Sequence, residues 1–271
     1  MSSPNRDPSW HEVADRVLVR RYAELDLSVG LVLGSERALV VDTRGDDAQG
    51  AELAEAVRGV TSLPWDVVVT HGHFDHCFGT SALLPARVWA HEGCAEHLRR
   101  TTGQQRAKWI EHYRSEDRAD VAEALARTRV VLPDHLVTAS AQLDLGDRVV
   151  RLLHLGVGHT DHDLVVHVPD AEVVFAGDLV EQGAAPDFED ARPRYWPSTA
   201  DELLRLAPSV VVPGHGNPVG PDFVRAQRDE IAAVARLGTA VREGSLTERQ
   251  ALDSSPYPAA TTSAALTAEW T

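Results

Sequence analysis

The segment from Val67 to His76 constrains this chain more than any other part of its sequence. It begins with the β-branched run Val67-Val68-Val69-Thr70, which is typical of a buried strand. The run passes into His71-Gly72-His73-Phe74-Asp75-His76, where four imidazole or carboxylate side chains fall within six residues. Zinc, iron and manganese all accept these ligands. One short turn cannot direct so many groups at a single ion, so the pattern favours two adjacent ions, an arrangement typical of hydrolysis.

Three further candidate ligands follow expected strands later in the chain. His159 ends the run Gly156-Val157-Gly158-His159, Asp178 follows Ala176-Gly177, and His215 follows Pro213-Gly214. Glycine beside each ligand allows the backbone to approach a bound ion closely. An isolated histidine or aspartate at a strand end is usually structural, but the repeated order of strand and then ligand predicts one shared metal centre. The alternative, a histidine-rich surface turn, leaves these later residues unexplained.

Composition narrows the class of partner. The 271 residues carry a formal net charge of −15 without a Lys/Arg cluster, so we expect no nucleic-acid partner. No apolar stretch approaches the roughly 18 residues of a membrane span, and the segment from Met1 to Trp10 lacks the apolar core of a signal peptide. Cys77 and Cys94 are the only cysteines, so we expect a cytoplasmic protein with reduced thiols that acts on a small molecule. The oligomeric state is left open, a homodimer included.

Strands and helices are expected in two similar halves. The first half is predicted to contain strands at 17–22, 28–33, 38–42, 66–70 and 88–90, with a helix over 51–60. The second half is predicted to contain strands at 148–154, 163–168, 172–176 and 210–212, a loop over 186–197 and a helix over 199–206. This order predicts an α+β fold in which two sheets pack face to face with helices outside. We treat residues 1–271 as a single domain.

Two helical segments stand apart from this pattern. Residues 91 to about 129 are strongly charged and are predicted to form two or three amphipathic helices inserted between sheet elements. They either decorate the surface or cap the site, and a cap would bring Trp109, His112 and Tyr113 onto or near one face. A helical C-terminal tail is expected after about 221, with a helix to about Leu237 and then a polar, Ala/Thr-rich stretch.

Together the ligand segments resemble those of the metallo-β-lactamase-fold hydrolases. The matching residues occur in the family's order between about 17 and 220, and they are Asp42, His71, His73, Asp75, His76, His159, Asp178 and His215. The resemblance implies a four-layer αβ/βα sandwich with the site at one edge of the two sheets. The motifs do not cover the helical segment at 91–129 or the tail.

The resemblance also implies a role for each matching residue. His71, His73 and His159 resemble the ligands of a first metal ion. Asp75, His76 and His215 resemble those of a second ion, and Asp178 resembles a carboxylate that bridges the two. Asp42 matches an acid that lies close behind the ligands.

These roles imply a cofactor and a reaction. The expected cofactor is two divalent metal ions, with zinc preferred and manganese or iron as alternatives. Activated hydroxide is expected to attack an ester, thioester, lactone or amide bond of a small molecule. Asp75 is the expected catalytic residue, a ligand that also accepts or passes a proton.

The ligand set discriminates among relatives of this fold. Flavodiiron-type proteins carry an acid where this chain has His73, which disfavours an electron-transfer function. True β-lactamases carry Cys or Ser where Asp178 stands, so β-lactam hydrolysis is expected only as a weak activity. An aspartate there is typical of glyoxalase II-like thioesterases and lactonases. However, acyl-homoserine lactonases usually place a tyrosine at the position of Glu181, and the basic glutathione-binding residues of glyoxalase II are not evident.

Two alternatives remain open. Persulfide dioxygenases share much of the motif but hold one iron through two histidines and an aspartate, which here would be His71, His159 and Asp178. A non-catalytic metal-binding protein is the other alternative, and the complete ligand set argues against it. The number and identity of the bound metals distinguish an iron oxygenase from a hydrolase.

Three residues are candidates for a substrate pocket: His162, Tyr195 and Trp196. His162 follows the candidate ligand His159 closely, and the alternatives are a contact behind the ligands or a plain loop histidine. Tyr195 and Trp196 lie in the loop between Asp178 and His215, where such folds often build the pocket wall. Cys77 is expected as a small buried apolar residue. The histidines without a partner pattern are expected at the surface: His91, His97, His112 and His135.

Overall fold

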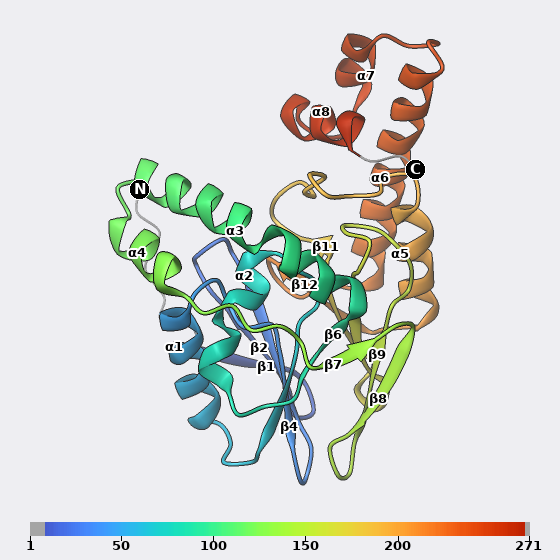
Figure 1. The fold of residues 1–271 in the computed structure, drawn as a ribbon. Coiled ribbons are helices and arrows are strands. Elements are labelled where there is room, and N and C mark those ends of the chain that lie inside the picture. Colours follow the sequence, from blue (N-terminus) through green and yellow to red (C-terminus); the bar gives the residue numbers. More distant parts are fainter. Residues whose placement is uncertain (1–8, 269–271) are drawn as a thin grey trace.

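The computed structural model describes residues 9–268 and contains two β-sheets packed face to face, with helices on both outer faces (Figure 1). This is the αβ/βα four-layer arrangement expected from the sequence, and the α+β class is confirmed. Most predicted strands are found within one or two residues of their expected bounds.

The first sheet contains seven strands in chain order. They are β1 (Trp10–Ala14), β2 (Val17–Arg21), β3 (Ser28–Leu33), β4 (Ala38–Val41), β5 (Trp65–Val68), β6 (Val88–His91) and β7 (His135–Val137). Strands β1 to β4 pair antiparallel, whereas β4 to β7 pair parallel. Because β4 and β5 run parallel, their carboxyl ends meet, and Asp42 comes to lie beside the turn that begins after β5.

The second sheet contains five strands in the order β12-β11-β10-β9-β8. They are β8 (Ser140–Asp144), β9 (Val149–Leu153), β10 (Val165–Val168), β11 (Val173–Glu181) and β12 (Val210–His215). Only β11 and β12 pair parallel, so their carboxyl ends also meet. The expected end of β11 at residue 176 is wrong: the strand continues to Glu181, and Asp178 lies within it where the pairing with β12 is irregular.

Apolar side chains fill the space between the two sheets. Val19, Leu39 and Val68 of the first sheet belong to the same buried cluster as Val166 and Phe175 of the second. Each alternates with residues that point to the outer faces, as expected for strands with a period of two. The sheets therefore hold one another through a continuous core, and the carboxyl ends of β4, β5, β11 and β12 open toward one edge.

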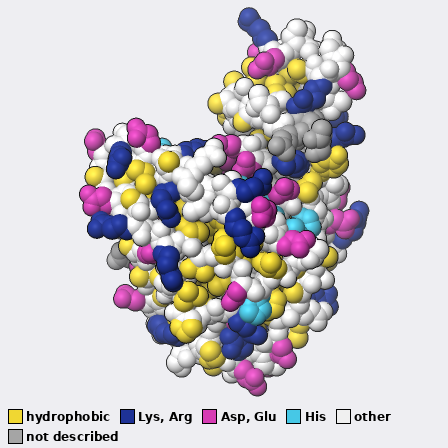
Figure 2. All heavy atoms as spheres, viewed as in Figure 1, with side chains coloured by type: hydrophobic (Ala, Val, Ile, Leu, Met, Phe, Trp, Pro, Cys, Tyr) yellow, Lys and Arg dark blue, Asp and Glu magenta, His cyan; other side chains and the backbone are white. Residues whose placement is uncertain are grey.

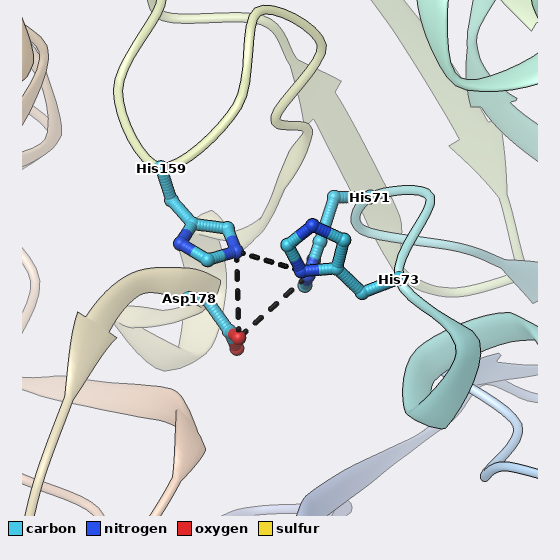
Figure 3. Close-up of side chains that lie close together, drawn as sticks. All are labelled: His71, His73, His159 and Asp178. Atoms are coloured by element: carbon cyan, nitrogen blue, oxygen red, sulfur yellow. Dashed lines mark hydrogen bonds and ion pairs between the residues drawn. The ribbon is translucent and has the colours of Figure 1, made fainter. Parts of the chain in front are cut away.

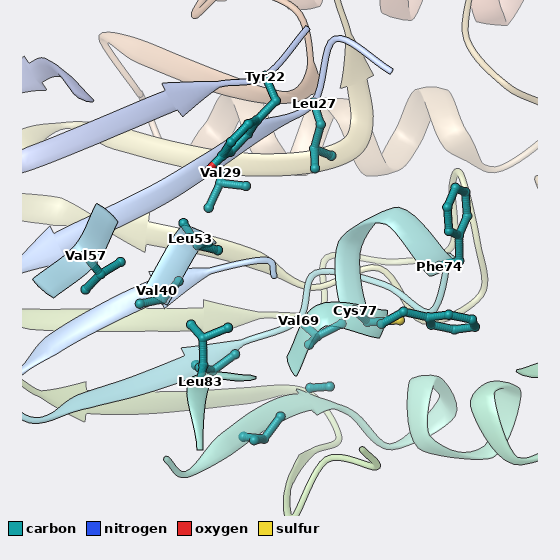
Figure 4. Close-up of a cluster of buried hydrophobic side chains, with 14 of the residues drawn as sticks. Tyr22, Leu27, Val29, Val40, Leu53, Val57, Val69, Phe74, Cys77 and Leu83 are labelled. Carbon is teal, nitrogen blue, oxygen red and sulfur yellow. The ribbon is translucent and has the colours of Figure 1, made fainter. Parts of the chain in front are cut away.

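Helices bury the outer faces of both sheets. On the first sheet lie α1 (Asp47–Arg58), α2 (Phe74–Cys77), η1 (Phe78–Leu83), α3 (Glu92–Ser115) and α4 (Ala119–Arg127). Figure 4 shows part of this layer, with Leu53 and Val57 of α1 beside Val40 of β4. Helix α1 begins earlier than predicted because the Asp46 side chain accepts a hydrogen bond from the Gln49 backbone N–H and caps the helix. The short η2 (Pro169–Ala171) joins β10 to β11.

The second sheet is covered by α5 (Trp196–Arg205) and α6 (Pro221–Arg242). Helix α6 runs beyond the predicted end at Leu237, and the expected polar tail contains α7 (Glu248–Ser254) and α8 (Ala259–Thr267). These last helices stand out from the body of the protein (Figures 1 and 2). Within residues 9–268, none of the helices is both long and apolar enough to cross a membrane.

Three strands were not predicted: β1, β7 and β8. All three are at sheet edges, and many of their side chains are exposed or half-buried, as in the pattern of β8. An edge strand needs fewer apolar residues than a central one, so its sequence gives a weaker signal.

Candidate metal centre

The seven candidate ligands converge at the edge where the parallel strands end. His71 and His73 lie on the turn after β5, and Asp75 and His76 lie on α2 directly after it. The second sheet supplies the other three from the loop after β9, from β11 and from the last residue of β12; these are His159, Asp178 and His215. The structure thus brings together every ligand position singled out from the sequence.

Four of these side chains form a first group. The ligand atoms of His71, His73, His159 and Asp178 all lie within 4.8 Å of one another. Figure 3 shows their side chains pointing toward one another. The Nδ1 atom of His73 is 3.0 Å from Nε2 of His159. The Oδ2 atom of Asp178 lies 3.6 Å from Nε2 of His71 and 3.7 Å from Nε2 of His159.

The other three ligands form a second group. Asp75, His76 and His215 also offer ligand atoms within 4.8 Å of one another. Asp178 reaches this group as well, because its Oδ1 is 3.2 Å from Nε2 of His76 and its Oδ2 is 3.2 Å from Nε2 of His215. One carboxylate therefore lies between two clusters of ligands, which is the arrangement that a bridging role requires.

The chemistry of these side chains fits bound cations. The Nε2 atom of His71 and the Oδ1 atom of Asp178 are buried and make no well-aligned hydrogen bond with the described residues, although Oδ1 lies 3.2 Å from Nε2 of His76. Leaving one such atom unsatisfied costs about 1–3 kcal/mol, so buried orphans of this kind need an explanation. Nitrogen and carboxylate oxygen facing one another in a buried cluster form a donor set suited to zinc and similar ions. We conclude that the residues present fit a metal centre.

The pKa shifts of His71 and Asp178 agree with this fit. In the cluster of side chains alone, by contrast, the Asp178 carboxylate outweighs burial and raises the pKa of His76 and of His215. Burial lowers the pKa of His71 well below 6.5, and the neighbouring His76 lowers it further. Burial opposes ionisation of Asp178, but the imidazoles of His215 and His76 outweigh it and hold the pKa of the carboxyl well below 3.8. A neutral imidazole and an ionised carboxylate are the protonation states that bind metal.

Asp42 lies directly behind the second group. One carboxylate oxygen accepts a hydrogen bond from the Thr70 backbone N–H, and the other accepts one from the Thr70 hydroxyl, each at 2.8 Å. Its Oδ2 also lies 2.8 Å from Nδ1 of His76. Asp42 adopts a left-handed backbone with φ 65°, a strain of about 1–3 kcal/mol that the packed site maintains. Its carboxylate therefore fixes the His76 ring so that Nε2 faces the cluster.

Other ligand rings are supported in the same way, and two of these contacts come from the loop after β11. Nε2 of His73 lies 3.1 Å from a carboxylate oxygen of Asp190, which leaves Nδ1 facing the first group. Nδ1 of His159 lies 3.2 Å from the carbonyl oxygen of Asp187. Asp190 is not among the residues predicted from the sequence. It lies in an irregular loop, and no spacing rule links it to His73.

Two glycines make room for this arrangement. A Cβ atom at Gly214 would lie 1.8 Å from Oδ1 of Asp178, so any side chain there would displace the candidate bridging carboxylate. A Cβ atom at Gly72 would lie 2.8 Å from Cδ2 of His97 and 3.1 Å from Nε2 of His162. Close packing around the ligands therefore leaves no room for a side chain at either position.

A cavity of about 340 Å³ opens above the ligands. Its floor includes His73, Asp75, Asp178 and His215. One wall comes from α2 and α3, and the other from the end of β11 and the loop that follows it. Helix α3 contributes His97, Thr101, Gln104, Gln105, Lys108 and Trp109 to the lining.

Helix α3 thus lies over the site as a cap. Of the two arrangements considered for residues 91 to about 129, surface decoration and a cap, the structure shows the cap for this helix. Among the residues that favoured a cap, Trp109 lines the cavity. Tyr113 is instead buried, and its hydroxyl donates to a carboxylate oxygen of Glu24. His112 is exposed and is not among the residues that line the cavity, in agreement with its expected surface position.

The predicted pocket residues lie elsewhere. Trp196 is fully buried, donates from Nε1 to the Leu179 carbonyl and packs against the His159 ring, so its expected place on the wall is wrong. The lining also omits Tyr195, which is 40% exposed. His162 is buried behind the turn, where its Nε2 accepts a hydrogen bond from the Gly72 N–H. It therefore supports the backbone that carries His71 and His73.

Two histidines expected at the surface are also placed differently. His97 lines the cavity, where burial and the neighbouring His162 lower its pKa to about 4. His91 is buried and caps α3 by accepting a hydrogen bond from the Gly93 N–H. A lone histidine inside a charged helical stretch gives no periodic signal, which explains why both were missed. Cys77 is buried, as expected.

Comparisons with known proteins agree with this fold. The family model described as the metallo-β-lactamase superfamily matches residues 24–215. The human acyl-coenzyme A thioesterase MBLAC2 is 28% identical over 212 residues, which cover 72% of this chain and 75% of the relative. The metallo-β-lactamase type 2 of Bacillus cereus is 26% identical over 196 residues, which cover 70% of this chain and 67% of the relative.

Solved structures show the same fold. A metallo-β-lactamase from Pontibacter korlensis superposes with a TM-score of 0.64 at 19% identity, covering 82% of this chain and 99% of that chain. The structure of VMB-1 gives a TM-score of 0.66 at 18% identity, covering 84% and 98%. The curated relatives named above are hydrolases, which agrees with the enzyme class expected from the sequence. By its matching family model, its fold and its ligand positions, this chain belongs to the metallo-β-lactamase superfamily.

Proposed function

We propose that this chain is a metal-dependent hydrolase that cleaves an ester, thioester, lactone or amide bond of a small molecule. The observation that carries the proposal is the meeting of two ligand groups, with Asp178 between them, at the floor of a cavity of about 340 Å³. A volume of this size is suited to a small-molecule ligand. We retain a cytoplasmic location as part of the proposal.

The first group, His71, His73, His159 and Asp178, would hold one divalent ion. Asp75, His76 and His215 would hold a second, with Asp178 as the shared ligand. Zinc is the proposed metal because imidazole and carboxylate are its common ligands, and manganese and iron accept the same set. Bound here, the ions would lower the pKa of a coordinated water and polarise the scissile bond.

The chain's own residues have three tasks in this reaction. Asp42 and Asp190 orient the His76 and His73 rings, so the ligand geometry exists before substrate arrives. Phe74, Trp109 and the opposite loop enclose the substrate and exclude part of the bulk water. Asp75, whose Oδ2 is 3.4 Å from Nε2 of His215, also lines the cavity, so its carboxylate can accept a proton near the reacting bond.

The scissile bond can be an ester, thioester, lactone or amide, and thioesters are the first substrates to assay. The human relative is named as an acyl-coenzyme A thioesterase, whereas the Bacillus cereus relative is named as a β-lactamase. We retain β-lactam hydrolysis in the proposal only as a weak activity. The reason is that Asp178 stands where true β-lactamases carry Cys or Ser. An iron-dependent dioxygenase using His71, His159 and Asp178 would leave the convergence of the second group unexplained.

Removal and return of metal test the proposal. The purified protein is assayed on a panel of thioesters, esters, lactones and β-lactams, then treated with a chelator, then reloaded with zinc, manganese or iron(II). We expect turnover of at least one class, its loss on chelation and its recovery with a divalent ion. Turnover that survives complete removal of metal would refute the mechanism, and oxygen uptake on iron loading would favour the dioxygenase.

A further inference from the structure

The wall of the cavity formed by α2 and α3 is aromatic. The Phe74 and Trp109 rings lie 4.3 Å apart between centroids, and both line the cavity. Phe74 is anchored in the buried cluster under α3, which fixes the position of this pair. An aromatic face within reach of a substrate attracts apolar groups, and it also attracts cations through the ring quadrupole.

The opposite wall is rich in carboxylates. The loop after β11 contributes Asp187, Glu189 and Asp190 to the lining, next to Glu181 at the end of the strand. Asp187, Glu189 and Asp190 are exposed, so they meet solvent and any ligand at the mouth. In Figure 2, acidic and basic side chains gather below the projecting C-terminal helices.

The cavity offers little positive charge from side chains. Among the described residues that line it, Lys108 is the one Lys or Arg, and its ammonium group is already paired with the Glu189 carboxylate. That ion pair joins α3 to the loop across the mouth. An anionic group on the substrate would meet the carboxylates without a free ammonium or guanidinium partner, and it would have to break this pair to gain one.

We propose that the cavity selects substrates whose group beyond the scissile bond carries a positive charge, such as an ammonium group, held between the Trp109 face and the Asp187 carboxylate. This inference rests on the proposed function for the identity of the reacting bond. The charge selection itself belongs to the walls and not to the ligands at the floor. An ammonium group there would combine a cation–π contact with attraction to carboxylates.

A charge series of one shape tests this. The three probes are acetyl thioesters of a trimethylammonio-ethanethiol, of the neutral isostere 3,3-dimethylbutanethiol, and of the anionic 2-mercaptoethanesulfonate. Their non-hydrolysable thioether analogues, in which CH₂ replaces the carbonyl, serve for binding by calorimetry. We expect the cationic analogue to bind roughly tenfold more tightly than the neutral one, a difference of about 1.4 kcal/mol, and the anionic one to bind most weakly.

Two variants of the cavity walls and one control variant test whether Asp187 and Trp109 cause the preference for a cation. Asp187→Asn keeps the side chain's size and its acceptor for the Glu189 N–H while removing the charge, so it should lower the cationic-to-neutral affinity ratio several-fold. Trp109→Leu keeps an apolar side chain but removes the aromatic face, with the same direction of change. Asp222→Asn on α6, an exposed carboxylate paired with Arg225 and absent from the lining, should leave the ratio unchanged.

The outcomes separate this inference from the proposed function. An anionic analogue that binds as tightly as the cationic one, or a ratio that Asp187→Asn leaves unchanged, overturns the charge selection. If the binding order holds and none of the thioesters is hydrolysed, the subsite stands and thioester hydrolysis falls. If all three thioesters are hydrolysed with equal kcat/KM and bound equally, hydrolysis stands and the charge selection falls.

Discussion

The floor and the walls of the cavity are built in different ways. The floor consists of buried or nearly buried side chains at the ends of four strands, where each ring that faces the cluster is held from behind. The walls consist of α3 and the irregular loop after β11. An ion pair between the exposed side chains of Lys108 and Glu189 joins the two. The sheets thus fix the reactive groups, while segments outside the sheets decide what reaches them.

The largest effect is expected from removing a ligand at the floor. His71→Ala should lose bound metal and lower kcat/KM by roughly 10³-fold or more, because about 4 kcal/mol of transition-state stabilisation depends on the ion. Metal content by mass spectrometry and turnover of the best substrate are the readouts. His11→Ala on β1, an exposed histidine hydrogen-bonded to Ser9, is the matched control and should retain both. An equal loss of metal and of turnover in the control would contradict the assignment of His71 as a ligand.

Removing support behind the floor should have a smaller effect. Asp42→Asn should weaken metal affinity by roughly 10–100-fold. The reason is that the Asp42 carboxylate orients the His76 ring and raises the basicity of the nitrogen that would bind the metal. Asp190→Asn should weaken it less, because Asp190 is exposed and its contact with His73 is screened by water. Metal titration against a competing chelator measures both, and a greater loss for Asp190→Asn would reverse the assigned order of support.

Changes in the walls should alter substrate affinity and leave the floor intact. Trp109→Leu should raise KM by about tenfold or less and leave metal content unchanged, because Trp109 lines the cavity but lies outside both ligand groups. The measurement pairs steady-state kinetics with metal analysis. Loss of metal in this variant would contradict the expectation, because it would show that the walls help to hold the ligands of the floor.

The smallest effect concerns a thiol behind the floor. Cys77 follows the ligand His76, its Sγ donates to the His73 carbonyl, and burial raises the pKa of its thiol well above 9. The thiolate is therefore depleted throughout neutral and mildly alkaline pH. We expect Cys77 to resist alkylation by iodoacetamide at pH 8 in the folded protein and to react in urea. Rapid modification without denaturant would show that the floor opens readily.

Much of the floor could be predicted from the sequence because its signal is local. His71, His73, Asp75 and His76 lie close together after a β-branched run, and His159, Asp178 and His215 each follow a predicted strand and a glycine. A run of apolar residues predicts a buried strand, and the point where the run stops predicts the end of that strand. For the same reason the two sheets and most central strands were predicted well, while the half-exposed edge strands β1, β7 and β8 were not.

The walls could not be predicted in the same way. Trp196 and Tyr195 were placed in the pocket by their position in a loop, yet Trp196 begins α5 and packs behind His159. His97 and Asp190 line the cavity through the packing of α3 against a loop far away in sequence. No periodicity records that contact, since it depends on how a helix and a loop meet in three dimensions and not on either segment alone.

Counting the metal ions bound to the native protein tests the central claim most directly. Native mass spectrometry together with elemental analysis gives both the number and the identity of the ions on each chain. We expect two divalent ions, zinc preferred, with His71→Ala and Asp75→Ala each lowering that number and abolishing hydrolysis. A single iron that supports oxygen consumption, or full hydrolytic activity in protein stripped of metal, would contradict this claim.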